Sequence, residues 1–348
     1  MNFKRSSGFS LIELMLAMLI GLIIMGGVMQ LYTSTRDTQR ASDDQLALLS
    51  DARFAMETIA YDLRHTGVWG RHNMSELVAC QKSGSNAYPC PAGFTMPLAT
   101  ADCKVEEYIN LARPLFAAEN DNPYLTTCAG ESYKAGTDVL SVRYADTNKL
   151  ADEVLSASYA YLRATPRVGM LFMGPTFPYP TNYGELADEP DPKKRKYSNH
   201  LLISRVYYVS DYTNVAGDGL PSLRRSDLVQ GPATESEVLL SGVEDFQLEY
   251  GVDLTRDSQV NSYVAADKID PTPGVDTLEW NNGSVIAVRV WLLMRSERKD
   301  RDNISSAQTF NIAGNTVTTP NDGYRRHLIS SVVKLRNTFQ IDKDKVGG

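Results

Sequence analysis

The longest regular pattern in the chain is an apolar run close to its N-terminus. Between Phe9 and Tyr32 the only charged residue is Glu13, and the basic residues Lys4 and Arg5 precede the run. A helix needs about 20 apolar residues to cross a bilayer, so this run predicts a membrane-spanning helix. A carboxylate within such a helix is energetically costly, which indicates that Glu13 has a function.

The helical pattern continues beyond the apolar run. From Thr33 to His65 the sequence contains neither proline nor glycine, and Gly67 predicts the end of the helix. Apolar residues recur in this second half on one helix face: Leu49, Ala52, Met56, Ile59 and Leu63. This stripe covers only about two heptads, so it predicts contact with the core of a soluble domain rather than a coiled coil. A helix from Phe9 to His65 would contain 57 residues and measure about 85 Å.

The start of the chain differs from an ordinary secretory signal, which carries its small-residue cleavage site after the apolar stretch. Here the small-residue junction, Gly8–Phe9, lies before that stretch. Cleavage at this junction would remove the basic leader and keep the apolar helix, whereas an uncleaved signal anchor is the alternative. Lys4 and Arg5 predict a cytoplasmic N-terminus, with the chain after residue 32 outside the cytoplasm.

The residues around this junction resemble a type III, or prepilin-type, leader: Lys4, Arg5, Gly8, Phe9 and Glu13, with Glu13 fifth counted from Phe9. The resemblance implies cleavage after Gly8 by the membrane aspartate prepilin peptidase, followed by N-methylation of Phe9. It also implies that Glu13 sets the register of this subunit against a neighbour, since the new amine of Phe9 is a cation. Two unit charges about 4 Å apart attract by about 4 kcal/mol at an effective dielectric of about 20, which would offset the cost of the carboxylate.

The composition fits one large globular domain or two small ones behind the membrane helix. The chain has 348 residues, of which 43% are hydrophobic and 22% charged, and its net charge is −7. An acidic chain is a poor match for the phosphate backbone of nucleic acids, so direct nucleic-acid binding is not expected. The basic run 193–196 lies beside the acidic stretch 188–192, which predicts a solvated loop rather than a nucleic-acid patch.

Four cysteines lie beyond the apolar run: Cys80, Cys90, Cys103 and Cys128. With the predicted topology they face an oxidising compartment, where disulfides form and persist. Four cysteines allow three pairings, and the sequence alone does not choose among them. We predict nearest-neighbour pairing, Cys80–Cys90 with Cys103–Cys128, because the loop-rich segment around them has no obvious core of its own. A zinc site is disfavoured, since no CxxC occurs and no histidine lies within a few residues of any cysteine.

From residue 137 onward the pattern changes to short runs rich in β-branched and aromatic residues, several with clean alternation of apolar and polar positions. We predict strands at 138–144, 201–209, 246–250, 285–295 and 329–335. Loops rich in proline and glycine separate them, and neither a βαβ rhythm nor an internal repeat is present. The sequence therefore predicts an α+β fold, with a long N-terminal helical spine packed on one or two antiparallel sheets.

These patterns divide the chain into a leader at 1–8, the membrane half of the helix at 9–32, its periplasmic half at 33–66, a cysteine-containing loop-rich segment at 67–136 and a β-rich domain at 137–348. The predicted location is the inner membrane, crossed once. The N-terminus is expected in the cytoplasm and the C-terminal domain in the periplasm.

The sequence contains no motif of an enzyme active site. Its four histidines form no metal-ligand spacing, and neither a G-x-S-x-G nucleophile elbow nor a Walker loop occurs. We therefore expect no enzymatic activity and no cofactor. A weak calcium candidate is formed by Asp253, Asp257 and Asn261, whose oxygen atoms suit that ion. An ordinary polar hairpin loop is the preferred interpretation of these residues.

Several longer stretches are similar to the PilW family of type IV pilus minor pilins: residues 52–70, 221–225, 242–253, 287–296 and 324–337. The first of them contains Gly67-Val68-Trp69-Gly70, directly after the predicted helix. The likeness covers both ends of the chain and the β region, and it is weakest in the cysteine-containing segment and the loop 174–196.

This resemblance implies a minor pilin, a protein that assembles rather than catalyses. Such proteins form a small complex with other minor pilins that primes polymerisation of the type IV pilus, sits at its tip and can carry a large adhesin. The implied partners are other minor pilins, the major pilin, prepilin peptidase, the assembly platform, inner-membrane lipid and a tip adhesin. Three alternatives stay open: a J-type minor pseudopilin of type II secretion, a role in DNA uptake through the same machinery, and a membrane-tethered periplasmic enzyme.

Overall fold

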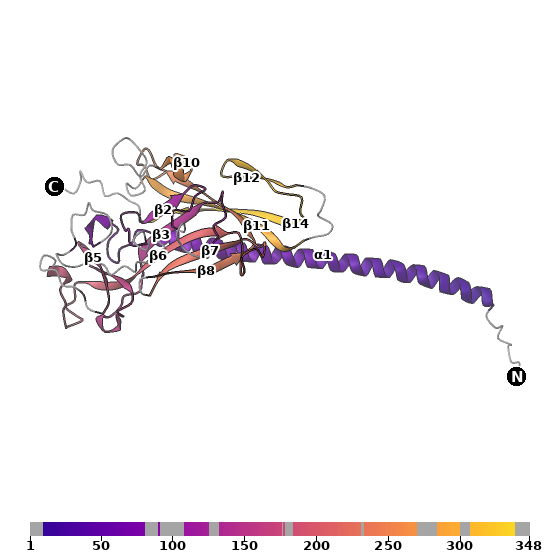
Figure 1. Cartoon of the computed structure of the whole chain (residues 1–348), viewed down its shortest axis with the longest axis horizontal. Coiled ribbons are helices and arrows are strands. Elements are labelled where there is room, and N and C mark those ends of the chain that lie inside the picture. The colour runs from indigo at the N-terminus through magenta and orange to yellow at the C-terminus, as the bar shows by residue number, and fades with distance from the viewer. Residues whose placement is uncertain are drawn as a thin grey trace. The chain divides into compact units, whose positions relative to one another are not determined.

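The predicted N-terminal helix is present as α1 (Leu11–His65) in the computed structural model (Figure 1). The structure describes residues 10–80, 90, 108–124, 132–175, 177, 184–230, 233–269, 284–299 and 307–337. Within the chain, two compact units are distinguished, Met1–Ser50 and Asp51–Gly348. The predictions on Gly8, Phe9, Cys103 and Cys128 concern positions outside the described residues.

The second half of α1 contributes to the core of the larger unit, as its apolar stripe predicts. Ala52, Met56, Ile59 and Leu63 are buried, and Leu49 is half-buried. The helix ends where expected, because Gly67 adopts φ +81°, a left-handed conformation that glycine reaches at little cost. Its N–H then donates to a carbonyl of a strand instead of continuing the helix.

The larger of the two main sheets has eight strands: β1 (Val78–Ala79), β2 (Leu115–Ala118), β3 (Val139–Ala145), β4 (Ala160–Ala164), β5 (Gly169–Met173), β6 (Ser198–Ser210), β7 (Ser222–Val229) and β8 (Ala233–Ser241). Its order is β1-β5-β4-β6-β3-β2, and β7 pairs with β6 and with β8. The pairing is antiparallel throughout, except that the short β1 runs parallel to β5. The central strand β6 thus has neighbours on both edges.

The smaller sheet has the order β10-β9-β11-β14 and is antiparallel. Its strands are β9 (Val243–Val252), β10 (Ser262–Val264), β11 (Val285–Lys299) and β14 (Tyr324–Lys334), and a separate hairpin joins β12 (Thr309–Ile312) to β13 (Asn315–Thr318). Four single-turn 3-10 helices are also described: η1 (Ser75–Leu77), η2 (Asp152–Val154), η3 (Gly184–Leu186) and η4 (Ala266–Lys268).

Strand β11 illustrates how alternation builds the core. Val288, Val290 and Leu292 share one face and are at most 1% exposed. In the register with β9, Val290 lies opposite Leu248 and Leu292 lies opposite Phe246, both of which are also buried. Burying a side chain of this size contributes about 1.5–3 kcal/mol, so this face holds the small sheet on the rest of the unit.

The α+β fold predicted from the sequence is confirmed, and each of the five predicted strands is present. They correspond to β3, β6, β9, β11 and β14, all longer or shifted by a few residues. Strands β1, β2, β4, β5, β7 and β8, which complete the large sheet, were not predicted. The expectation of purely antiparallel pairing was wrong only for β1, which forms a two-residue parallel ladder.

Candidate assembly site

The first half of α1, described by itself, presents an apolar surface. Every side chain from Leu11 to Tyr32 is exposed, among them Leu11, at 78%, and Leu22, at 73%. In length and composition this stretch is able to cross a membrane. So large an apolar surface needs lipid or other apolar helices around it, since soluble proteins rarely expose contiguous apolar patches beyond a few hundred Å².

Glu13 lies in the first turn of α1 and caps that turn. The backbone N–H of Ser10 donates to Glu13 Oε2 over 2.9 Å, and the backbone N–H of Ile12 donates to Ser10 Oγ over 3.2 Å. This is a capping box, in which two otherwise unpaired N–H groups of the helix start are satisfied. The S-x-x-E spacing could have revealed it in the sequence. Glu13 therefore has a bonding partner within its own chain, besides the intersubunit partner predicted for it.

Asp62 attaches the second half of α1 to the large sheet. Its carboxylate is fully buried and accepts hydrogen bonds from the hydroxyls of Tyr144, at 2.8 Å, and Tyr207. It also pairs with Arg205 over 2.8 Å, and Arg205 in turn pairs with Asp227 over 3.1 Å. Burial, followed by the Asp62 charge, raises the pKa of both tyrosines, so they stay protonated donors.

Both ends of the PilW-like similarity meet at the C-terminal end of α1. The side-chain amide of Asn337 donates to the carbonyls of Arg64, at 3.0 Å, and Thr66, at 3.1 Å. These carbonyls belong to the last turn, where no intrahelical donor remains. The chain then turns at Gly70, whose missing side chain makes room for the His200 ring: a Cβ there would lie 2.7 Å from Cδ2. Residues 52–70 and 324–337 thus form one packed corner.

A disulfide is present, as expected for an oxidising compartment. Cys80 and Cys90 are bonded, with their Cα atoms 4.4 Å apart. Both cysteines contact the cluster of apolar side chains that contains Trp69. The pairing of Cys103 with Cys128 concerns residues outside the described ones and stays a prediction.

The three residues considered as calcium ligands take part in the hydrogen bonds of a turn. Asp253 accepts backbone N–H groups of Asp257 and Ser258, and Asn261 Oδ1 accepts that of Leu254 over 2.6 Å. Burial alone would raise the pKa of Asp253, but backbone donors in this turn lower it overall. Among the described residues, no group of three or more His, Cys, Asp or Glu side chains could hold a metal ion. The geometry agrees with the polar-loop interpretation.

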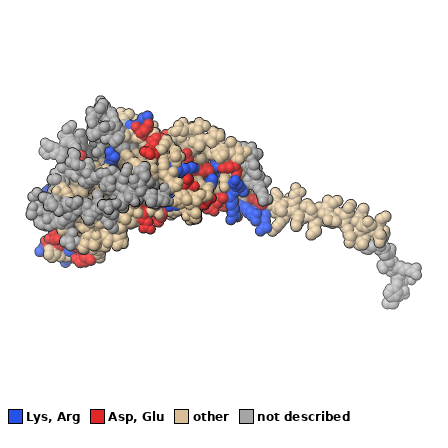
Figure 2. Space-filling view, in the orientation of Figure 1, with Lys and Arg blue, Asp and Glu red and all other residues tan. Residues whose placement is uncertain are grey.

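The positive charge of the basic run 193–196 is partly neutralised. Some of the acidic residues that do this lie outside the expected stretch 188–192. Arg195 pairs with Asp152 and Glu153, each over 3.4 Å, and Lys194 pairs with Asp191 over 3.8 Å. On the face shown in Figure 2, basic and acidic side chains are interspersed over the β-rich unit. On this face, the described residues form no broad positive surface of the kind that binds a phosphate backbone.

A single apolar helix that carries one carboxylate, joined to a β-rich unit, is the plan of a membrane-anchored pilin. The comparisons with known families agree. Residues 206–337 match the family described as Type IV Pilus-assembly protein W, and residues 3–29 match the prokaryotic N-terminal methylation motif. The resemblance found in the sequence is confirmed: the chain carries a region that matches the PilW family and a prepilin-type methylation motif at its N-terminus.

One solved structure is matched, a type IV-like pilin from Thermus thermophilus. It is 14% identical in sequence, and the match covers 60% of this chain and 84% of that chain with a TM-score of 0.27. Among curated proteins, no significant match is found.

Proposed function

We propose that the chain is a minor pilin that helps to prime and assemble the type IV pilus, in a complex with other minor pilins at the pilus tip. The observation that carries this proposal is the combination of a PilW domain with a methylation motif and an apolar helix on one chain. A pilin with these parts is built to be stored in a membrane and then transferred into a fibre. Its role is structural, and no reaction of its own is proposed.

The first steps would be processing of the N-terminus. Prepilin peptidase would cut between Gly8 and Phe9 and leave a methylated amine on Phe9. The leader carries Lys4 and Arg5, so its removal leaves the apolar helix without its basic anchor. Glu13, the one charge of that helix, would then pair with the Phe9 amine of a neighbouring subunit and set the register between them.

The larger unit would supply the lateral specificity of the complex. Before assembly, the chain would cross the inner membrane once, with its N-terminus in the cytoplasm and the β-rich unit in the periplasm. After assembly it would lie in the pilus, next to other minor pilins and the major pilin. The assembly platform and a large tip adhesin would be further partners. The Asp62 network suits this role, since it attaches the part of α1 within the larger unit to the large sheet.

The test is an in-frame deletion, scored in the same strain for sheared surface pili and for secreted exoproteins. We expect loss of pili with normal secretion, restored by the wild-type gene. The N-terminus of the membrane-bound protein, read by mass spectrometry, should begin at Phe9. A protein that still begins at Met1 while the peptidase is active would contradict the proposal.

The same experiment separates the pilus from the type II secretion system. Loss of secretion with normal pili would assign the chain to the secretion system as a minor pseudopilin. Normal pili together with normal secretion would contradict both assembly roles, provided that no second copy of the gene compensates, which a double deletion checks.

A further inference from the structure

Strand β14 forms an edge of the small sheet. It pairs with β11 over residues 326–334 without a register shift, and among the described residues no strand pairs with its other edge. The strand is 11 residues long and contains no proline. Natural sheets usually protect such an edge with a bulge, a proline or a covering segment, because an unpaired edge is a template for pairing with another chain.

The hydrogen bonds to β11 show which backbone groups of β14 face this free edge. The N–H of Leu335 donates to the carbonyl of Ile286 over 2.9 Å. In an antiparallel ladder every second residue directs its N–H and C=O to the partner strand, so the odd-numbered residues of β14 bond to β11. Ser330, Val332 and Lys334 therefore direct their backbone groups toward the free edge. Within the described part of the chain these outward groups have no hydrogen-bond partner.

This edge is open to solvent. Val332 is 50% exposed, and Ser330 and Lys334 are exposed as well. Ile329 and Ser331 lie on the core-facing side of the strand, opposite buried residues of β11, yet both are only half-buried. Core-facing residues stay partly exposed where nothing covers the edge of a sheet, so an incoming strand can reach the backbone of β14.

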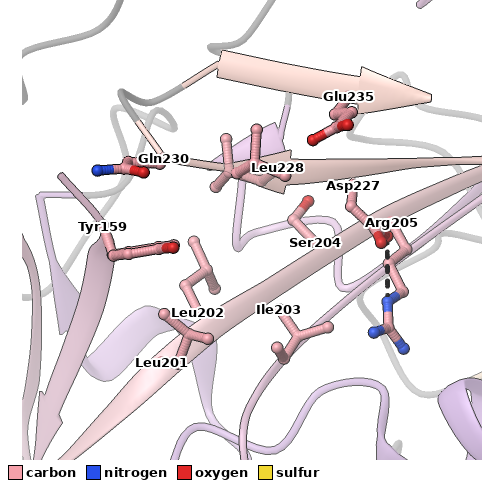
Figure 3. A pocket seen from close by; sticks show the side chains of 11 residues that line it. Tyr159, Leu201, Leu202, Ile203, Ser204, Arg205, Asp227, Leu228, Gln230 and Glu235 are labelled. Atoms are coloured by element: carbon pink, nitrogen blue, oxygen red, sulfur yellow. Dashed lines mark hydrogen bonds and ion pairs between the residues drawn. The ribbon is translucent and has the colours of Figure 1, made fainter. Parts of the chain in front are cut away.

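An unpaired stretch of β6 differs in this respect. Between the ladders with β4 and β7, residues 202–204 have no strand partner on one edge within the described chain. A pocket of about 430 Å³ lies beside them (Figure 3). Leu202 and Ser204 are only 2% and 1% exposed, however. That stretch is closed to another chain, whereas the edge of β14 is not.

The C-terminal end of the β14 edge is basic. Lys334 and Arg336 are exposed, and neither forms an ion pair with a described residue. At the other end of the strand, Arg326 is already paired with Glu244 and Asp322. A lysine on an edge deters pairing with neutral or basic strands, and an acidic side chain directly opposite would complement it. The occupant that fits this edge is therefore extended and acidic.

We propose that the free edge of β14 pairs with an extended segment of a partner protein, which places an acidic side chain beside Lys334. Strand addition of this kind takes its affinity from main-chain hydrogen bonds and its specificity from the side chains that flank them. The incoming strand would continue the small sheet at Ser330, Val332 and Lys334. The inference does not depend on which appendage the chain helps to build.

The test uses the detergent-solubilised full chain and fluorescence anisotropy of a labelled peptide, acetyl-Thr-Glu-Val-Thr-Val-Thr-Val-amide. With its glutamate opposite Lys334 in an antiparallel pair, the middle threonine lies opposite Val332 and directs its N–H toward β14. An N-methyl group on that threonine removes a donor that faces β14, whereas one on the next valine removes a donor that faces away.

We expect saturable binding of the parent peptide. The N-methyl group on the threonine should weaken binding by at least about tenfold, and the one on the valine by less than about threefold. Equal effects of the two N-methyl groups, or no saturation of the parent peptide up to about 1 mM, would overturn the proposal.

A charge reversal locates the binding site. Lys334→Glu should weaken binding of the parent peptide by about threefold and strengthen binding of a peptide with lysine in place of glutamate by a similar factor. Lys193→Glu, at an exposed position outside the sheets, is the control and should leave the preference unchanged. An unaltered preference in Lys334→Glu would reject the site. Self-association of the full chain that Lys334→Glu abolishes, without peptide binding, would assign the edge to a second copy and equally overturn the proposal.

Discussion

Asp62 is the residue whose environment is most informative about how the helix and the sheets are joined. It sits on a helix, yet its partners Tyr144, Arg205 and Tyr207 are 82, 143 and 145 positions away in the sequence. Taking a carboxylate out of water is costly, and only complete bonding offsets that cost. The network thus joins elements that lie far apart in the sequence.

Removing this carboxylate should destabilise the larger unit strongly. Asp62→Asn leaves Arg205 without its buried partner, so we expect the free energy of unfolding to fall by about 3 kcal/mol. Tyr207→Phe removes one donor to this buried carboxylate and should cost about 2 kcal/mol. The measurement is urea denaturation of the solubilised protein, with Asp51→Asn, an exposed acid on the same helix, as the control. A loss in Asp62→Asn no greater than in the control would show that the network adds little.

Asp138 should make stability depend on pH. Burial, only partly opposed by backbone donors such as Asn120 and Leu248, raises the pKa of Asp138 from 3.8 to about 7. Between these values the folded state binds more protons than the unfolded state, so stability falls as pH rises from 4 to 7. The full effect is at most about 4 kcal/mol.

The pH effect of Asp138 has to be measured as the difference between two proteins, because His72 also titrates in this range. Burial lowers the pKa of His72 to about 4, so its contribution to stability rises with pH. We expect the free energy of unfolding of the wild-type protein to fall, relative to that of Asp138→Asn, as the pH rises from 4 to 7. The check is a series of denaturation curves for both proteins at half-unit intervals. Parallel curves for the two proteins would mean that Asp138 does not titrate in this range.

At the scale of elements, the sequence predicts those whose apolar positions repeat regularly. The stripe of α1 and the alternation in β11 belong to this group, and both are buried as expected. Strand β7 was missed because its buried positions include Ser222 and Arg224, which read as polar loop residues. Ser222 Oγ donates to the carbonyl of Tyr212, and one terminal nitrogen of Arg224 donates to the carbonyl of Thr213. Alternation cannot reveal a strand whose inward positions are polar and paired through distant contacts.

The turn after α1 offers a test of close packing between elements. Gly70 and Gly136 both adopt positive φ, +72° and +84°. A Cβ at Gly70 would lie 2.7 Å from the His200 ring, whereas nothing lies within 4 Å of one at Gly136. Both alanine variants therefore carry the backbone cost of about 1–2 kcal/mol, and Gly70→Ala should lose about 1–3 kcal/mol more. Thermal or urea denaturation measures the difference, and equal losses would show that His200 moves aside freely.

At the scale of the whole molecule, some features can be predicted from the sequence and others cannot. The leader, the apolar helix and Glu13 form one local motif, which is why the sequence alone predicts them. The capping box of Ser10 and Glu13 is equally local. The Asp62 network joins residues that are 82, 143 and 145 positions apart, and no local pattern in the sequence specifies such contacts.

The two bonding roles of Glu13 can be separated by two substitutions. Glutamine keeps an acceptor for the Ser10 N–H, as a capping box allows, but carries no charge, whereas alanine lacks both. If the charge sets the register between subunits, Glu13→Gln and Glu13→Ala should both reduce incorporation into sheared pili, by at least about tenfold given an attraction of about 4 kcal/mol. Immunoblots of the pilus and membrane fractions measure this ratio, with Gln45→Ala, an exposed position on α1, as the control.

The pattern of the two variants decides between the roles. Normal incorporation of Glu13→Gln with loss of Glu13→Ala would mean that capping of the helix start is what assembly needs, and it would contradict a role for the charge. Normal incorporation of both would reject either role. Loss of both, with equal amounts of the variants in the membrane, would show that the capping hydrogen bond is insufficient. Glu13 would then exchange its bond within the chain for the amine of a neighbour when the subunit leaves the membrane.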